Sequence, residues 1–209
     1  MKIIKRNNAV SVIAIITLII VTGFTASTTS CQKKEKNNEV KEKKYVINMF
    51  VTHGHCSTPF SGSVDNLKLE LEEHPDLENP LEGMKISFEI DPNTFNVCAS
   101  EELTQTIKIP GLFISKKNEK ITFRTTAIYT MGIDWYQVNG MLSIKGVERE
   151  MKFFVTGIRN SSATRPTFLV LEGRVNLFDW DIDYNKIAGL DAQLDSSKWM
   201  HLNMRFDLK

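Results

Sequence analysis

The stretch that indicates the fold is Val138-Asn-Gly-Met-Leu-Ser-Ile-Lys-Gly-Val147, in which apolar and polar residues alternate up to Lys145-Gly146. A second alternating run, Met151-Lys-Phe-Phe-Val-Thr156, follows it. Successive side chains of a β-strand point to opposite faces, and a short turn joins two paired strands. The stretch therefore predicts a β-hairpin with one apolar face and one polar face.

Runs of the same kind recur along the chain and predict further strands. We expect strands at 45–52, 64–72, 84–91, 121–129, 135–144, 151–158, 168–176 and 200–208. We interpret 54–62, which contains Pro59, as a connection or bulge, and 73–83 as a surface loop. Ser100 is a candidate cap for one short helix. About eight strands with little helix predict an all-β antiparallel fold, a sandwich or a closed barrel. A barrel of about eight strands has an interior that can hold one small ligand.

The first thirty residues have the character of an export signal. Lys2, Lys5 and Arg6 form a basic start, an apolar run spans 10–21, and small residues fill 26–30. This order is typical of a secretory signal peptide, and the apolar run is short for a bilayer-spanning helix. We therefore assign 1–30 to a signal peptide that is removed on export.

Cys31 follows the small residues directly and precedes a polar stretch, which is the arrangement of a bacterial lipoprotein signal. Acyl chains on Cys31 would form a stable membrane anchor. Residues 32–44 hold one apolar residue and predict a charged, flexible tether. Residues 45–209 then form one domain. Ordinary secretion, with a cut nearby and Cys31 unused, is the alternative. Because Asp does not follow Cys31, we expect an outer-membrane anchor, with the domain facing the periplasm or displayed at the surface.

Composition excludes several classes of function. The formal charge of +1 includes the three basic residues of the signal peptide, so the exported chain is near −2, which argues against a nucleic-acid binder. No nucleophile elbow, phosphate-binding glycine loop or His-Glu-x-x-His motif occurs. We therefore predict that the protein is not an enzyme. The sequence leaves the oligomeric state open.

Two cysteines remain in the domain, Cys56 and Cys98. Export would allow a disulfide between them, which on the chain-entropy argument would stabilise the fold by about 3–4 kcal/mol. Two buried free thiols are the alternative, because cysteine also packs as a small apolar residue.

The central hairpin resembles the YceI-like family of bacterial lipid-binding proteins. That family shows a Gly-x-Leu-x-Ile-x-Gly-Val hairpin, which corresponds here to Gly140 through Val147, followed by Met151-Lys-Phe-Phe-Val. Phe123 matches a family strand, and Phe60-Ser-Gly62 a looser early region. Val175-Asn-Leu-Phe-Asp-Trp-Asp-Ile182 resembles a segment that usually reads Asn-Arg-x-Asp-Phe/Trp-Gly. Leu177 replaces that Arg and Asp181 that Gly, so the role of the Arg does not carry over.

The resemblance implies a lipocalin-like antiparallel barrel whose apolar lumen takes a polyisoprenoid or a quinone-type lipid. Such a chain has no hydrogen-bonding groups along its length, so it needs apolar walls and a polar contact for its head group at the mouth. The expected partners are this apolar ligand and, through the anchor, a membrane; no other cofactor is expected. The wall residues that we predict are Ile86, Phe88, Ile121, Phe123, Leu142, Ile144, Phe153, Val155, Leu169, Leu171, Met204 and Phe206.

Two alternatives stay open. The same side chains could fill the barrel and form a core, which would leave a structural or interaction domain. His53, His55 and Cys56 could instead bind a metal ion, with His74 or His201 as a further ligand. Because no second ligand pair accompanies them, we predict surface or loop histidines and no metal site. Asp179, Asp181 and Asp183 alternate with apolar residues, and we interpret them as the solvated face of a strand rather than a cation site.

Overall fold

The computed structural model describes residues 45–53, 56–71, 79–98, 100–184 and 198–208, without the side chains of His53 and Cys56. The chain divides into two units, residues 1–38 and residues 39–209, and every described residue belongs to the second. The predicted signal peptide, Cys31 and the tether lie outside the described residues. Among the described helices, none has the length and apolar character needed to cross a bilayer.

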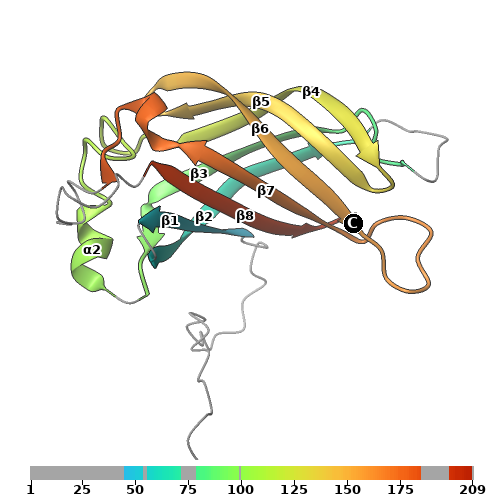
Figure 1. Cartoon of the computed structure of the whole chain (residues 1–209), viewed down its shortest axis with the longest axis horizontal. Helices are drawn as coiled ribbons and strands as arrows, with labels where there is room; N and C mark the ends of the chain where they lie inside the picture. The colour runs from blue at the N-terminus through green and yellow to red at the C-terminus, as the bar shows by residue number, and fades with distance from the viewer. Residues whose placement is uncertain (1–44, 54–55, 72–78, 99, 185–197, 209) are drawn as a thin grey trace, which may run out of the picture. The chain divides into compact units, whose positions relative to one another are not determined.

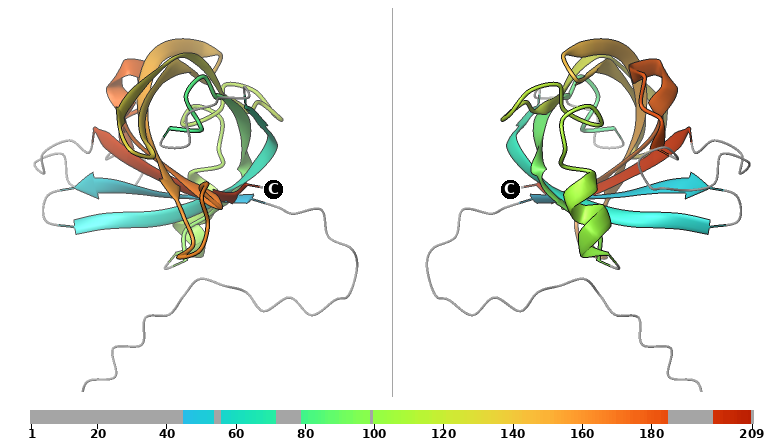
Figure 2. Two further views of the ribbon diagram at one scale, coloured as in Figure 1. Left: turned by 90° about the vertical axis from the view of Figure 1, so that its right-hand side faces the viewer. Right: turned by 90° about the vertical axis from the view of Figure 1, so that its left-hand side faces the viewer.

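The second unit is a closed antiparallel barrel of eight strands in sequence order, in which β1 pairs with both β2 and β8 (Figures 1 and 2). All pairings that close the barrel lie within this unit, so residues 39–209 contain everything that the closed sheet requires. The strands are β1 (Tyr45–His53), β2 (Cys56–Glu70), β3 (Lys85–Asn96), β4 (Ile121–Gly132), β5 (Trp135–Ile144), β6 (Val147–Ile158), β7 (Phe168–Asn176) and β8 (Trp199–Asp207).

The hairpin predicted around Lys145-Gly146 is confirmed. β5 and β6 pair residue for residue from Trp135↔Thr156 to Ile144↔Val147. Lys145 and Gly146 both have positive φ, 55° and 72°, which suits a two-residue turn between twisted strands. Burial alternates along β5 from Tyr136 to Ile144, so one face of the hairpin points into the barrel and the other outward. The predicted all-β barrel class is therefore correct.

For residues 56–62 the interpretation as a connection was wrong, while the alternative of a bulge agrees with a register shift between Ser61 and Ser63 in the pairing of β2 with β3. Residues 54 and 55 lie outside the described residues. β2 begins at Cys56, and Pro59 and Gly62 lie within it, opposite Phe50 and Ile47 of β1. Pro59 is exposed on the strand, while Gly62 faces inward, where an added Cβ would lie 2.8 Å from the Phe95 ring. Both residues read as strand breakers in the sequence. Pairing with β1 and the close approach of Phe95 account for the strand.

The sequence had indicated a strand for the acidic stretch after β7. The structure instead has a 3-10 helix there, η1 (Leu177–Trp180). Asp179, Asp181 and Asp183 are exposed, as expected for a solvated face, while Trp180, Ile182 and Tyr184 are buried. Asp181 ends η1 with φ 54°, a conformation that favours glycine, the residue more usual here in the YceI-like segment. Leu177, in place of the usual Arg, is fully buried.

The two ends of the barrel differ. At one end, called the α2 end here, lie α2 (Glu101–Thr106) and η1 (Figure 1). The side chain of Ser100 accepts a hydrogen bond from the Leu103 amide (3.1 Å), which confirms the predicted helix cap. At the opposite end, called the hairpin end, lie the β4–β5 turn and the loop 159–167 (Figure 1).

Candidate functional site

The inner face of the barrel is the candidate site. All twelve residues that the sequence assigned to the wall are buried, with at most 2% of the side chain exposed. They come from β3, β4, β5, β6, β7 and β8, and the polar residues that alternate with them lie on the outer face. The structure thus brings these residues together, and their contact with a ligand stays a prediction.

The sequence-based list missed much of the same face. β1 and β2 contribute buried side chains through alternation that was visible in the sequence of β1 but was hidden by Pro59 and Gly62 in β2. The further buried strand residues are Ile47, Met49, Val51, Phe60, Val64, Ile90, Phe95, Tyr136, Val138, Val175, Met200 and Leu202. The inner face therefore receives side chains from every strand.

Phenyl rings form one cluster inside the barrel. The centroids of Phe88 and Phe123 are 5.2 Å apart, those of Phe123 and Phe153 are 4.8 Å apart, and those of Phe88 and Phe153 are 6.4 Å apart. A Cβ added to Gly140 would lie 2.5 Å from the Phe123 ring. The ring of Phe123 therefore lies directly over the backbone of β5, because Gly140 has no side chain there.

Few polar groups are buried in the described part of the chain. The three buried polar residues are Ser63, Thr104 and Asp134. Ser63 pairs with the exposed Val46 and so lies on the outer face, Thr104 is in α2, and Asp134 is in the β4–β5 turn. Thr125 of β4, only partly buried, both donates to and accepts from the backbone of Ile86 at 3.0 Å. The inner face is thus apolar along its length.

A buried tyrosine stands at each end of this face. At the hairpin end, the hydroxyl of Tyr136 accepts a hydrogen bond from the Leu81 amide at 3.4 Å. Tyr184 follows η1 at the α2 end. Burial raises the pKa of both phenols, so both hydroxyls stay protonated at neutral pH and can donate a hydrogen bond. Neither tyrosine is among the wall residues predicted from the sequence, although Tyr136 alternates with the apolar Val138.

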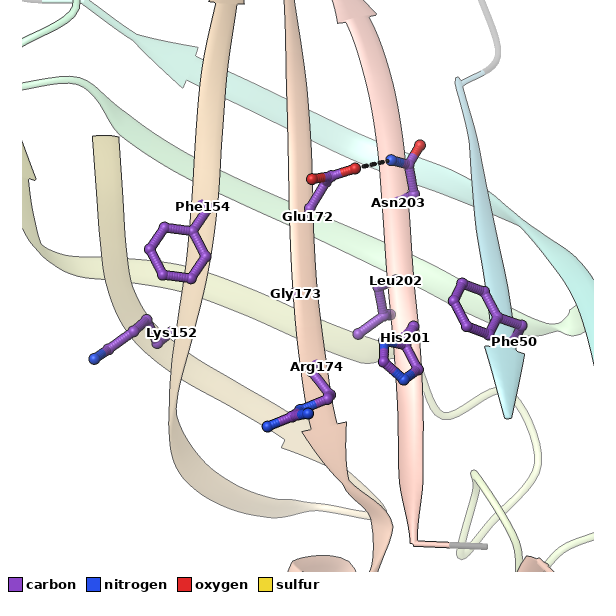
Figure 3. A pocket seen from close by; sticks show the side chains of 9 residues that line it. All are labelled: Phe50, Lys152, Phe154, Glu172, Gly173, Arg174, His201, Leu202 and Asn203. Atoms are coloured by element: carbon purple, nitrogen blue, oxygen red, sulfur yellow. Dashed lines mark hydrogen bonds between the residues drawn. The ribbon is translucent and has the colours of Figure 1, made fainter. Parts of the chain in front are cut away.

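A groove of about 490 Å³ lies outside the barrel, across β6, β7, β8 and β1 (Figure 3). Lys152 and Phe154 border one side, and the stacked pair Phe50 and His201, 4.5 Å between centroids, borders the other. Burial and the nearby Arg174 lower the pKa of His201. None of the twelve predicted wall residues lines this groove. Its charged rim does not suit a long apolar chain, so we place the candidate site in the interior.

The metal and disulfide predictions rest largely on residues that are not described. His55, His74 and the side chains of His53 and Cys56 lie outside the described part, and His201 lies on the outer face. The described residues contain no cluster of three or more metal-ligating side chains. Cys98 is disulfide-bonded. Its pairing with Cys56 stays a prediction.

An eight-stranded antiparallel barrel with an apolar inner face is the architecture of the lipocalin-like binding proteins. Within that class, residues 34–206 match the YceI-like domain, and the chain belongs to the YceI-like family. Barrel proteins of this family are generally binding proteins rather than enzymes. No curated protein matches the chain.

Two solved structures are similar to this chain. BcnA of Burkholderia cenocepacia is similar with a TM-score of 0.57 and 15% sequence identity, over 78% of this chain and 96% of BcnA. The YCEI protein of Campylobacter jejuni is similar with a TM-score of 0.49 and 12% identity, over 89% of this chain and 96% of that protein. At these identities, the likeness to BcnA supports the barrel fold.

Proposed function

We propose that this protein is a lipid-anchored protein of the cell envelope that holds an isoprenoid or a similar apolar lipid inside its barrel. It sequesters or carries the ligand and performs no chemistry on it. The observation that carries the proposal is the inner face itself, to which all eight strands contribute apolar side chains. A prenyl chain offers only apolar surface, so it matches such walls without leaving a polar group unpaired.

The head group would lie at one end of the barrel, beside a buried tyrosine. A protonated phenol can donate to a phosphate, an alcohol or a quinone oxygen. Tyr136 and Tyr184 stand at opposite ends, so they distinguish the two orientations of the ligand. If the head group lies at the hairpin end, Tyr136→Phe weakens binding of a prenyl phosphate and Tyr184→Phe does not; if it lies at the α2 end, the effects are reversed.

The first experiment is native mass spectrometry of the unit from residue 39 onward, exported and purified from bacteria. A bound species with the mass of an isoprenoid supports the proposal and identifies the ligand class. A mass equal to that of the polypeptide, together with no displacement of an apolar fluorescent dye by a long-chain isoprenoid, contradicts it. That result would favour a filled barrel that serves as a structural or interaction domain. The close packing of Phe88, Phe123 and Phe153 is the observation that supports this alternative. An added mass matching one metal ion would favour metal binding instead.

Anchoring has its own test. The proposal places the acyl chains on Cys31, with residues 32–44 as the tether. Cells that express the full chain and are fed labelled palmitate should transfer label to it, and the protein should fractionate with the outer membrane. Cys31→Ser should remove the label and release the protein. Label retained on Cys31→Ser, or a wild-type chain without label, would contradict the anchor but not ligand binding.

A further inference from the structure

The tip of the β4–β5 hairpin exposes an unusual amount of apolar surface. Four large apolar side chains lie within residues 129–135: Tyr129 (52% exposed), Met131 (48%), Ile133 (68%) and Trp135 (44%). Trp135 also packs against Phe154 of β6, with the two ring centroids 6.2 Å apart, and Phe154 is itself exposed. Single exposed apolar residues are ordinary, but a contiguous exposed group on a soluble domain marks a contact surface.

Packing within the folded domain does not explain why these exposed side chains are apolar. Ile133 occupies the turn, where glycine, asparagine or aspartate is usual and where a β-branched apolar side chain contributes no packing. The turn residue with positive φ is Asp134. The inward positions of the hairpin are already filled by Tyr136 and Val138, which are fully buried. The exposed group therefore lies on the outward side and the tip, apart from the core.

The tip also presents no uncompensated charge. Its single charged residue, Asp134, is buried, and its carboxylate accepts from both Nε and Nη2 of Arg159, the latter at 3.0 Å. Beyond Arg159, the neighbouring loop 159–167 carries one further cation, the exposed Arg165, and no acidic residue. An apolar tip beside a cationic loop is complementary to a bilayer with anionic head groups, because the apolar side chains enter the interface while arginine contacts phosphate.

The position of the tip agrees with an anchor at Cys31, and this step rests on the anchor proposed above. Tyr45, the first described residue, packs on Phe206 with ring centroids 6.3 Å apart. Phe206 pairs with Leu169, and Leu169 with Gly157, whose amide donates to the carbonyl of Asp134 at 2.7 Å. The tether therefore joins the barrel near the hairpin end. Residues 32–44 span at most roughly 45 Å when extended, so an anchor at Cys31 keeps this end within reach of the membrane.

We propose that the β4–β5 tip, residues 129–135 together with Phe154, inserts into the interface of a phospholipid bilayer. Tyr129 and Trp135 have the amphipathic rings that occupy the head-group level, and Met131 and Ile133 reach the acyl region. Insertion brings the hairpin end, with Tyr136, against the lipid. The inference does not require the barrel to hold a ligand, because the inserting side chains are exposed and are not part of the buried inner face.

The test uses the unit from residue 39 onward, which lacks Cys31 and so reports on the tip alone. Its co-sedimentation is measured with vesicles of phosphatidylcholine and phosphatidylglycerol. We expect the wild type to bind the vesicles. The double variant Met131→Ser/Ile133→Ser should have an affinity for the vesicles that is lower by about ten-fold or by more, because two inserted apolar side chains are lost. The matched control is Ile109→Ser, which removes a comparably exposed side chain (58%) beyond α2, and it should bind like the wild type.

A second measurement locates the tip directly. Brominated lipids should quench part of the tryptophan fluorescence of the wild type, and Trp135→Phe should remove that part. The other two tryptophans lie at the α2 end: Trp180 is buried in η1, and Trp199 pairs with Asn176 next to η1. Unchanged melting temperatures would show that the variants fold. The inference is overturned if the wild type does not bind vesicles, if Ile109→Ser loses as much binding as the double variant, or if Trp135 is not quenched. Self-association through the tip without vesicle binding would likewise overturn it. Unchanged ligand binding by the double variant would separate this result from the proposed function.

Discussion

Gly173 of β7 faces Phe153 of β6, and the Phe153 ring occupies the space that a side chain at Gly173 would need. The two residues are paired in the sheet, and a Cβ added to Gly173 would lie 2.1 Å from Cδ1 of Phe153. A Cβ added to Gly140 of β5 would lie 2.5 Å from the Phe123 ring and 2.4 Å from the carbonyl oxygen of Arg124, although Gly140 pairs with Thr125 rather than with Phe123. Glycines on the inner face thus decide where the large rings of the barrel lie.

Gly173→Ala should therefore destabilise the fold. Because the added methyl group must displace the Phe153 ring, we expect a loss of about 1–3 kcal/mol in the free energy of unfolding. Urea denaturation measures it. Gly132→Ala is the control, because its added Cβ would meet its nearest neighbour, Trp135, at 3.8 Å, and we expect a change within roughly 0.5 kcal/mol. Equal effects of the two substitutions would contradict the close approach of Phe153.

Lys120 links two strands through two carboxylates, those of Asp65 and Asp91, each at 2.9 Å. Lys120→Met should lower stability by about 1 kcal/mol, since the pairs are partly exposed. Burial opposes ionisation of Asp91, but hydrogen bonds from Lys120 and Asn93 outweigh it and lower its pKa; in the same way, the carboxylates outweigh burial and raise the pKa of Lys120. The stabilisation is therefore present between the ordinary values of 3.8 and 10.5.

This pH range is tested by measuring the free energy of unfolding of the wild type and of Lys120→Met as a function of pH. The difference between them should disappear as the pH falls through the lowered pKa of Asp91, and again as it rises through the raised pKa of Lys120. Lys117→Met, which changes an exposed lysine of the same connection, should show no such profile. A difference that does not change with pH would show that Lys120 acts by packing alone.

The ion pair between Arg159 and Asp134 is the most buried one described, with the Asp134 side chain 9% exposed. Arg159→Met should cost about 2–4 kcal/mol, because it leaves a buried carboxylate without its partner. Asp134→Asn added to this variant should restore part of the loss, and asparagine also tolerates the positive φ of the turn. Thermal unfolding of the single and double variants measures both effects; a double variant less stable than Arg159→Met would contradict the account.

His201 reports on the outer groove. Burial lowers its pKa first and Arg174 lowers it further, so Arg174→Gln should raise the pKa while leaving it below 6.5. Because the folded state binds this proton less readily than the unfolded chain, the wild type loses stability as the pH falls through the lowered pKa, and the variant should lose less. An NMR titration of the imidazole measures the pKa. Arg205→Gln, whose guanidinium lies over Phe168, is the control and should leave the His201 titration unchanged.

Alternation alone predicted most of the barrel. The bounds of β5 and β7 agree with the sequence, because in each an inward apolar residue is followed by an outward residue over the whole strand. The twelve wall residues are buried for the same reason. The central hairpin also indicated the family, which the match of residues 34–206 confirms.

Tertiary structure decided what depends on neighbours distant in sequence. Pro59 and Gly62 read as breakers, yet they lie in β2 because β1 supplies the pairing and Phe95 fills the space over Gly62. Asp179 to Asp183 alternate like a strand, yet the chain turns there, because Trp180 donates to the carbonyl of Val147 at 2.8 Å. The exposed β4–β5 tip contains large apolar residues of the kinds that also occur in the buried faces of the strands. Which apolar side chains meet a core and which meet the surroundings depends on closure of the barrel, and a local pattern does not contain that information.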